Sequence, residues 1–312
     1  MIRVLSHVGP AERLRLPADL VERVEVVPVP LKGPVPDGLT GDVLISFDGF
    51  GSNLPELLDR GVRWVHFIGT GIDGFPLDRL GPDCVLTNSR GQSAVPIAEW
   101  VLACMLAFEK RLPEAWIDAP PAPSAEPVRL GTLEGRRLAL LGLGGIGSAV
   151  VERARPFGME IRALRRRPGP APVDGVEMMS SVEELVDGAE HLVIVAPLTE
   201  ETRGLVDRRL FAAMTPGVHL VNVARGGIVV TDDLRGALDD GTVALASLDV
   251  TDPEPLPAGH WMFDHPGVRV SSHVSWNWPH ATRVRAEILE TNLRHFLDGE
   301  PLERAIEPDV GY

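Results

Sequence analysis

A glycine-rich turn between an apolar run and a helical pattern constrains this chain more than any other feature. Residues 138–141 read LALL, the next six read GLGGIG, and a helical pattern covers 149–157. In a turn of the form G-x-G-x-x-G, Gly142 permits the tight bend, Gly144 lets a ligand approach the backbone, and Gly147 lets the helix pack closely on the strand. The segment therefore predicts a β-α-β unit, and with it a parallel sheet covered by helices.

Short apolar runs alternate with helix-period segments over nearly the whole chain. Strands are predicted at 2–8, 24–29, 42–47, 62–68, 85–88, 138–141, 160–164, 191–196, 219–223, 244–250 and 268–274. Helices are predicted at 54–61, 97–112, 149–157, 182–189, 231–240 and 280–297. The later runs are apolar throughout, which is typical of strands buried on both faces. The pattern predicts an α/β protein, and a length of 312 residues fits two domains.

The glycine turn and the helix after it predict a dinucleotide cofactor. A helix N-terminus leaves N–H groups free to bind a pyrophosphate. The strand, the turn, the helix and the next strand all fall where such a site requires them. The residues expected at the pyrophosphate are Gly142, Gly144, Gly145, Ile146 and Gly147.

The end of the second strand of this unit predicts which dinucleotide binds. NAD is usually held there by an Asp or Glu about 20 residues after the turn, which accepts hydrogen bonds from the ribose. This chain has no carboxylate at that place, and Arg165 and Arg166 follow the strand instead. A guanidinium is a bidentate partner for a phosphate. We therefore expect NADP, with NAD as the alternative if these arginines form only a solvated basic face.

Charge and cysteine content exclude several classes of function. A formal net charge of -14 opposes binding to the phosphate backbone of a nucleic acid. No apolar stretch is long enough for a membrane span or a signal peptide, so we expect no membrane partner. The two cysteines, Cys84 and Cys104, make neither a disulfide framework nor a zinc site, and they fit a reducing, cytoplasmic location.

Three further segments place polar residues at the predicted carboxyl ends of strands, where open α/β sheets bind ligands. Arg225 follows one apolar run, Glu254 lies in the loop after the next, and His273 lies near the end of the last. We expect these three side chains to converge on the cofactor. A single histidine at a strand or helix end is typically structural, and we interpret His280 and His295 in that way.

At this point the chain resembles the D-isomer-specific 2-hydroxyacid dehydrogenases, and among them the glyoxylate/hydroxypyruvate reductase-like members, over nearly its whole length. The motifs that carry the resemblance are FIGTGID from residue 67, AE from 98, GLGGIG from 142, APLT from 196, NVARG from 222, DV from 249 with EP from 254, and the late His273. Their order and spacing are far more specific than any single motif.

The resemblance implies two Rossmann-like parallel-sheet domains, with an NAD(P)-binding domain inserted into a discontinuous substrate-binding domain. We accordingly predict residues 1–96 as the first part of the substrate-binding domain, 97–279 as the NAD(P)-binding Rossmann domain, and 280–312 as a C-terminal helix that returns to the substrate-binding domain. The implied activity is the NAD(P)H-dependent reduction of a small 2-keto acid to the D-2-hydroxy acid. The implied assembly is a homodimer, with the 97–112 helix and the proline-rich arm after it, including Trp116, at the interface.

The resemblance also implies roles for single residues. Arg225 would bind the carbonyl oxygen and the carboxylate of the substrate, and His273 would donate a proton to the developing alkoxide. Glu254 would pair with His273 and keep it protonated, because a neighbouring carboxylate raises an imidazole pKa. Cofactor contacts are further implied for Pro197, Thr199, Thr202, Ala224 and Asp249, the last to the nicotinamide carboxamide. Substrate contacts are further implied for Thr70, Gly71 and Trp276.

The sequence departs from the family pattern near the catalytic residues. Ser272 stands where a proline is usual before the histidine, Trp100 where a histidine is common, and Gly145 where the turn frequently has an arginine. Trp276 and Trp278 are bulky where the family often has small residues, and they would narrow the pocket. Pocket shape therefore depends on loops at 50–53, 70–72 and 276–278, and the resemblance does not name the 2-keto acid.

Two other functions stay open at this stage. Formate or phosphite oxidation runs on the same scaffold, although the formate enzymes generally carry glutamine where Glu254 stands. A dinucleotide-sensing corepressor shares the fold as well, but such proteins carry long disordered tails that we do not expect here.

Overall fold

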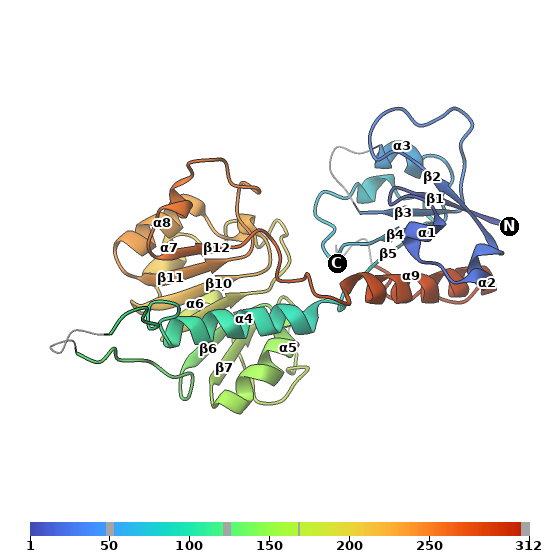
Figure 1. The fold of residues 1–312 in the computed structure, drawn as a ribbon. Coiled ribbons are helices and arrows are strands. Elements are labelled where there is room, and N and C mark those ends of the chain that lie inside the picture. The colour runs from blue at the N-terminus through green and yellow to red at the C-terminus, as the bar shows by residue number, and fades with distance from the viewer. Residues whose placement is uncertain (48–52, 121–125, 168, 307–312) are drawn as a thin grey trace. The chain divides into compact units, whose positions relative to one another are not determined.

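The computed structural model describes residues 1–47, 53–120, 126–167 and 169–306. The chain divides into two compact units, residues 1–92 with 279–312, and residues 93–278. Each unit has its own parallel sheet and its own core (Figure 1). The predicted fold class is confirmed, because both units are α/β with a parallel sheet. The second unit begins at Ser93, directly before a long helix and a few residues ahead of the boundary expected from sequence.

The first unit contains, in its described part, a five-stranded parallel sheet in the order β2-β1-β3-β4-β5. Its strands are β1 (Ile2–Ser6), β2 (Val24–Pro28), β3 (Val43–Ser46), β4 (Trp64–Phe67) and β5 (Val85–Asn88). Its helices are α1 (Ala11–Leu14), α2 (Ala18–Val21), α3 (Leu54–Leu58) and α9 (Ala281–Asp298).

Alternate residues of the central strands feed the two faces of this sheet, as the two-residue period of a strand requires. Val43 and Ile45 of β3 pack with Leu289 and Leu293 of α9. Leu44 points the other way, into a cluster that includes the three leucines of α3. Helix α9, from the far end of the chain, therefore completes the core of the amino-terminal sheet and runs beside it in Figure 1.

The second unit contains, among the residues described, a seven-stranded parallel sheet in the order β12-β11-β10-β9-β6-β7-β8. Its strands are β6 (Arg137–Leu141), β7 (Glu160–Leu164), β8 (Glu177–Met178), β9 (His191–Ile194), β10 (Val218–Asn222), β11 (Val243–Leu248) and β12 (Val268–Val270). Its helices are α4 (Ala94–Glu109), α5 (Gly145–Ala154), α6 (Val182–Val186), α7 (Arg208–Ala212) and α8 (Thr231–Asp239).

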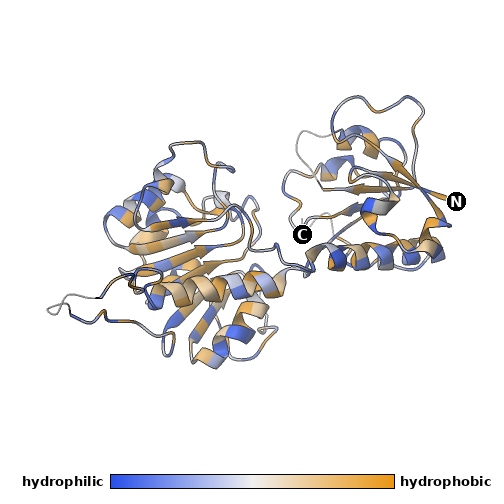
Figure 2. Cartoon of the chain, viewed as in Figure 1, coloured by the Kyte–Doolittle hydropathy of each residue, from blue (hydrophilic) through white to orange (hydrophobic). Residues whose placement is uncertain are grey.

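Both faces of the seven-stranded sheet are covered. Val221 of β10 packs in one cluster with residues of α4 and α5. Its neighbour Leu220 packs in the opposite cluster with residues of α6, α7 and α8. Figure 2 shows the resulting apolar colouring along the strands of this sheet. The strand order reverses between β6 and β9, which is the place where open sheets of this kind bind their ligands.

Three element boundaries differ from the sequence prediction for identifiable reasons. Helix α4 begins before Pro96 because proline is tolerated in a first turn, and it ends before Arg111, whose φ is 50°. Helix α5 begins within the glycine turn itself, and a short 3-10 turn at Arg155–Phe157 follows it. Strand β12 stops at Val270 because the chain turns there. The elements α1, α2, α7 and β8 were not predicted, since each is only a few residues long.

No helix in the described part of the chain has the length and apolar character needed to cross a membrane.

Candidate functional site

The glycine turn leaves open space over a helix N-terminus. Gly142 has a φ of 108°, and a Cβ there would lie 2.7 Å from the backbone nitrogen of Ala196. A Cβ on Gly144 or Gly145 would meet nothing within 4 Å. Gly144 precedes α5 and supplies no side-chain cap, so the first N–H groups of the helix face that open side. The turn therefore fits a pyrophosphate, whose oxygens need N–H donors and a close approach.

Arg165 lies directly after β7, where the ribose of a dinucleotide would be held. It is half-buried, and its Nε is enclosed without a hydrogen-bond partner among the described residues. Arg162, by contrast, donates to Glu177 at 3.1 Å. Arg166 is exposed. The end of β7 thus offers guanidinium donors and, at the expected place, no carboxylate that would accept from a ribose hydroxyl.

The loop after β9 brings Pro197, Thr199 and Thr202 together. The hydroxyl of Thr202 donates to the carbonyl of Pro197 at 2.7 Å, and the backbone N–H of Thr199 donates to that hydroxyl at 2.8 Å. The three residues expected on the ribose side therefore form one compact turn.

Asn222, the last residue of β10, fixes the backbone that carries Arg225. Its Oδ1 accepts from the N–H of Ala224 at 3.0 Å, and its Nδ2 donates to the carbonyl of Arg225 at 3.0 Å. Arg225 Nη1 donates to the carbonyl of Ala224 at 2.7 Å. The sequence reasoning included Asn222 in a motif but gave it no role. Asn222 is 1% exposed, and its role follows from these hydrogen bonds, for which the sequence carries no signal.

Gly226 allows the Arg225 loop to lie against the loop after β11. A Cβ at Gly226 would lie 2.0 Å from the carbonyl carbon of Thr251 and 2.5 Å from the nitrogen of Asp252. No side chain fits there, so glycine is required for this approach. Glu254 lies in the same loop as Thr251 and Asp252. The positive charge of Arg225 helps to lower the pKa of the Glu254 carboxyl.

His273 and Glu254 form a hydrogen-bonded pair. His273 Nδ1 donates to Glu254 Oε1 at 2.7 Å, and the two side chains are 37% and 38% exposed. The hydrogen bond from His273 is the main reason that the pKa of Glu254 lies below its ordinary value. Because Nδ1 is engaged, Nε2 is the ring nitrogen left to face a ligand.

Asp249 holds the turn that presents His273. Asp249 is 1% exposed. Its Oδ1 accepts from the Ser271 hydroxyl at 2.5 Å and from the Val274 N–H at 2.9 Å, while Oδ2 accepts from the Ser275 N–H at 3.0 Å. Its carbonyl accepts from the His273 N–H at 2.9 Å. These bonds retain His273 at a φ of 54°, an uncommon conformation for a residue other than glycine.

The remaining predicted residues lie apart from this group or in the other unit. Trp276 is half-buried and packs on the core cluster of α4 and α5. Thr70 and Gly71 follow β4 in the first unit, where the carbonyl of Thr70 accepts from Asn88 Nδ2 at 2.6 Å. Of the pocket loop expected at 50–53, residues 50–52 lie outside the described residues.

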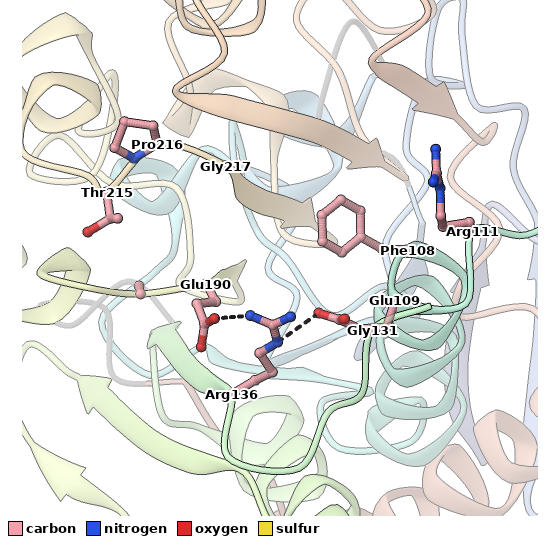
Figure 3. A pocket seen from close by; sticks show the side chains of 10 residues that line it. Phe108, Glu109, Arg111, Gly131, Arg136, Glu190, Thr215, Pro216 and Gly217 are labelled. Atoms are coloured by element: carbon pink, nitrogen blue, oxygen red, sulfur yellow. Dashed lines mark hydrogen bonds and ion pairs between the residues drawn. The ribbon is translucent and has the colours of Figure 1, made fainter. Parts of the chain in front are cut away.

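A cavity of about 420 Å³ lies at the opposite edge of the second sheet, near the amino ends of β6, β9 and β10. None of the predicted site residues lines it. Figure 3 shows Arg136 between the carboxylates of Glu190 and Glu109, with Phe108 and Arg111 nearby.

A buried chain of polar side chains begins at this cavity and runs beneath α4. Glu109 accepts from His191 Nε2 at 3.2 Å, and the Nδ1 atoms of His191 and His219 lie 3.2 Å apart. His219 Nε2 lies 2.9 Å from the hydroxyl of Ser247. Burial holds the pKa of His219 well below its ordinary value. This series of hydrogen-bonded side chains ends at Ser247 on β11, two residues before Asp249.

Comparisons with known proteins identify the family. Residues 102–275 match the family described as D-isomer specific 2-hydroxyacid dehydrogenase, NAD binding domain. The chain is 30% identical to the human glyoxylate reductase/hydroxypyruvate reductase over 85% of this chain and 83% of that protein. It is 38% identical to glyoxylate/hydroxypyruvate reductase A of Serratia proteamaculans, over 44% of each chain.

A solved structure is similar over almost the full length. The D-isomer specific 2-hydroxyacid dehydrogenase from Xanthobacter autotrophicus Py2, in complex with NADPH and MES, is 25% identical and superimposes with a TM-score of 0.79. The match covers 100% of this chain and 99% of that one.

Proposed function

The chain belongs to the D-isomer specific 2-hydroxyacid dehydrogenase family, and on that premise we propose that it reduces a small 2-keto acid to the D-2-hydroxy acid with NADPH. The observation that carries the proposal is the hydrogen-bonded pair of His273 and Glu254, with Arg225 in the adjoining loop, at the carboxyl edge of a sheet that carries a dinucleotide turn.

In this proposal the side chains divide the work of a ketone reduction. Arg225 binds the carboxylate and the carbonyl oxygen through its planar fork of donors. His273 releases the proton on Nε2 to the carbonyl oxygen as that oxygen takes up the electron pair of the C=O bond. Glu254, ionised because its pKa is lowered, stabilises the imidazolium before the transfer. The dinucleotide, when bound, supplies the hydride that reaches the carbonyl carbon.

The unit of residues 93–278 would bind the cofactor, and the unit of 1–92 with 279–312 would bind the substrate. The N–H groups of Gly144, Gly145, Ile146 and Gly147 would hold the pyrophosphate, and the turn of Pro197, Thr199 and Thr202 would line the ribose. Ala224 would line the nicotinamide side. Asp249 would bind the carboxamide through Oδ2, which accepts one hydrogen bond, from Ser275, among the residues that the structure describes.

NADP is the proposed dinucleotide, with NAD as the alternative. The enclosed, unpartnered Nε of Arg165 supports it, because a phosphate would satisfy that donor. Arg166 adds positive charge at the same strand end, and the relative solved with NADPH supports the same choice.

The proposed substrates are small 2-keto acids such as glyoxylate and hydroxypyruvate, for which the human relative is named. Backbone N–H groups of Thr70 and Gly71 would bind the carboxylate, and Trp276 would limit the size of the side chain.

We also propose that the protein forms a homodimer and that it resides in the reducing cytoplasm. The arm after α4 exposes Trp116 and Ile117 at 74% and 69%, and the residues approaching β6 expose Val128 and Leu130. Exposed apolar side chains of this kind on one extended segment are typical of a protein interface. Both cysteines are unpaired thiols.

Turnover of glyoxylate, hydroxypyruvate and phenylpyruvate with NADPH and with NADH tests the proposal. We expect NADPH-dependent reduction of at least one acid and its loss in His273→Ala, because no proton donor remains at that place. A purified, folded protein that binds NADPH and reduces none of these acids would contradict the proposal.

A further inference from the structure

Glu254 occupies a segment without regular secondary structure. The segment runs from the end of β11 through Thr251, Asp252 and Pro253, and the Glu254 side chain is more than a third exposed. An exposed glutamate samples several rotamers, and holding it in one of them costs conformational entropy. The observed pairing with His273 therefore needs an anchor in the segment itself.

Thr251 supplies that anchor from within the same segment. Its hydroxyl donates to the carbonyl of Pro253 at 2.9 Å, and the residue is 8% exposed. The hydrogen bond from His273 is the largest cause of the lowered pKa of the Glu254 carboxyl, and the backbone of Thr251 contributes to it.

Two neighbouring parts of the structure also contact the 251–254 segment. The hydroxyl of Thr231, the first residue of α8, donates to the carbonyl of Asp252 at 3.0 Å. The backbone at Gly226 lies so close to Thr251 that no Cβ would fit between them. The orientation of the loop is therefore set by the protein before any substrate binds.

We propose that Thr251 is a positioning residue, which folds the 251–254 segment back on itself and so holds Glu254 against His273. The proposal rests on the proposed function insofar as His273 is the proton donor. The pair exists only while the carboxylate lies within hydrogen-bonding distance of the ring, as it does here at 2.7 Å, and an adjacent carboxylate favours the charged form of an imidazole. Without the hydrogen bond from Thr251 to the Pro253 carbonyl, the Glu254 carboxylate can move away from the imidazole. We then expect His273 to lose its proton at a lower pH.

The test compares two variants of Thr251 with a matched control. Thr251→Val removes the hydroxyl and keeps the branched shape, whereas Thr251→Ser keeps the hydroxyl. The control is Thr291→Val in α9, which also removes a threonine hydroxyl bonded to a backbone carbonyl, that of Glu287 at 3.0 Å. The pH profile of kcat/KM for 2-keto acid reduction is measured for each protein, together with KM for NADPH and thermal unfolding.

We expect the alkaline limb of Thr251→Val to move to lower pH by about one unit, the lower end of the effect of an adjacent opposite charge. Thr251→Ser and Thr291→Val should keep the parent profile, and KM for NADPH should stay unchanged in all three. A folded Thr251→Val protein with the parent pH profile would overturn the proposal. If Thr251→Val does not fold, Thr251→Ala removes the same hydroxyl, and an unchanged profile in that folded protein overturns the proposal equally.

An NMR titration of the ligand-free proteins separates this inference from the proposed function. The His273 resonance is identified by its absence from His273→Gln. If the parent reduces no 2-keto acid, the proposed function fails, yet a lower protonation midpoint of His273 in Thr251→Val still supports the positioning role. The same midpoint in both proteins would refute it.

Discussion

Adding one methyl group at Gly226 should separate the two loops that carry Arg225 and Glu254. The Cβ of Gly226→Ala would lie 2.0 Å from the carbonyl carbon of Thr251 and 2.1 Å from its oxygen. Ordinary contacts begin at 3.4 Å, and the obstacle is backbone that cannot rotate away, so the loops must part by more than an ångström. A misplacement of about 1 Å costs about 100-fold in rate when catalytic groups must be aligned.

The expected result is therefore a fall in kcat of about 100-fold, or about 2.7 kcal/mol in activation free energy. KM for NADPH should change little, since the turn at 142–147 belongs to β6 and α5. Gly227→Ala is the matched control, because its Cβ would meet only side-chain atoms, at 3.4 Å or more. Thermal unfolding verifies that both variants are folded. A folded Gly226→Ala protein with a kcat near that of Gly227→Ala would refute the reasoning.

Four further outcomes are expected. Arg165→Ala should raise KM for NADPH by about tenfold or more and leave KM for NADH nearly unchanged, since one charge-assisted bond to the 2′-phosphate contributes about 1.5–3 kcal/mol; equal effects on both cofactors would argue against the phosphate contact. Arg225→Lys keeps the charge but loses the planar fork, so both kcat and kcat/KM should fall for every 2-keto acid, and a normal kcat would remove Arg225 from catalysis. The lowered pKa of Glu254 means that its pairing stabilises the fold above the ordinary glutamate pKa and is lost as the pH falls through the lowered value; the difference in thermal stability between the parent and Glu254→Gln should therefore vanish in acid, and a constant difference would contradict the pairing. Ser247→Ala leaves a nitrogen of the buried His219 without its hydroxyl partner and should cost about 1–3 kcal/mol of unfolding free energy, measured by denaturant titration against a Ser180→Ala surface control.

The strands and the glycine turn could be predicted because each leaves a local signature, and the residues proposed to react were selected by their places at the ends of predicted strands. An apolar run marks a buried strand wherever it occurs, and Arg225, Glu254 and His273 each stand beside one. Element ends were less predictable. A strand was predicted through Val274, but β12 ends at Val270, and the residues after it are turned by bonds to Asp249, which lies far away in the sequence.

The supports of the site could not be predicted from local pattern. Thr251 and Asn222 look like ordinary loop and strand-end residues until their partners are known. Glu109 is the clearest case, because a charged residue at a helix end is usually solvated, yet here it is 5% exposed. Its burial depends on His191 and Arg136, which arrive from two other strands. Such tertiary contacts determine whether a polar residue is buried, and they produce no periodic pattern in the sequence.

The buried chain beneath α4 has a property that its members lack singly: it has a direction. A neutral imidazole carries one N–H, so each ring can donate on one side only while it accepts on the other. With His191 donating to Glu109 and accepting at Nδ1, His219 must donate to His191 and accept from Ser247. The tautomers of the two buried histidines are therefore set together, by the carboxylate at one end of the series and the hydroxyl at the other, across three neighbouring strands.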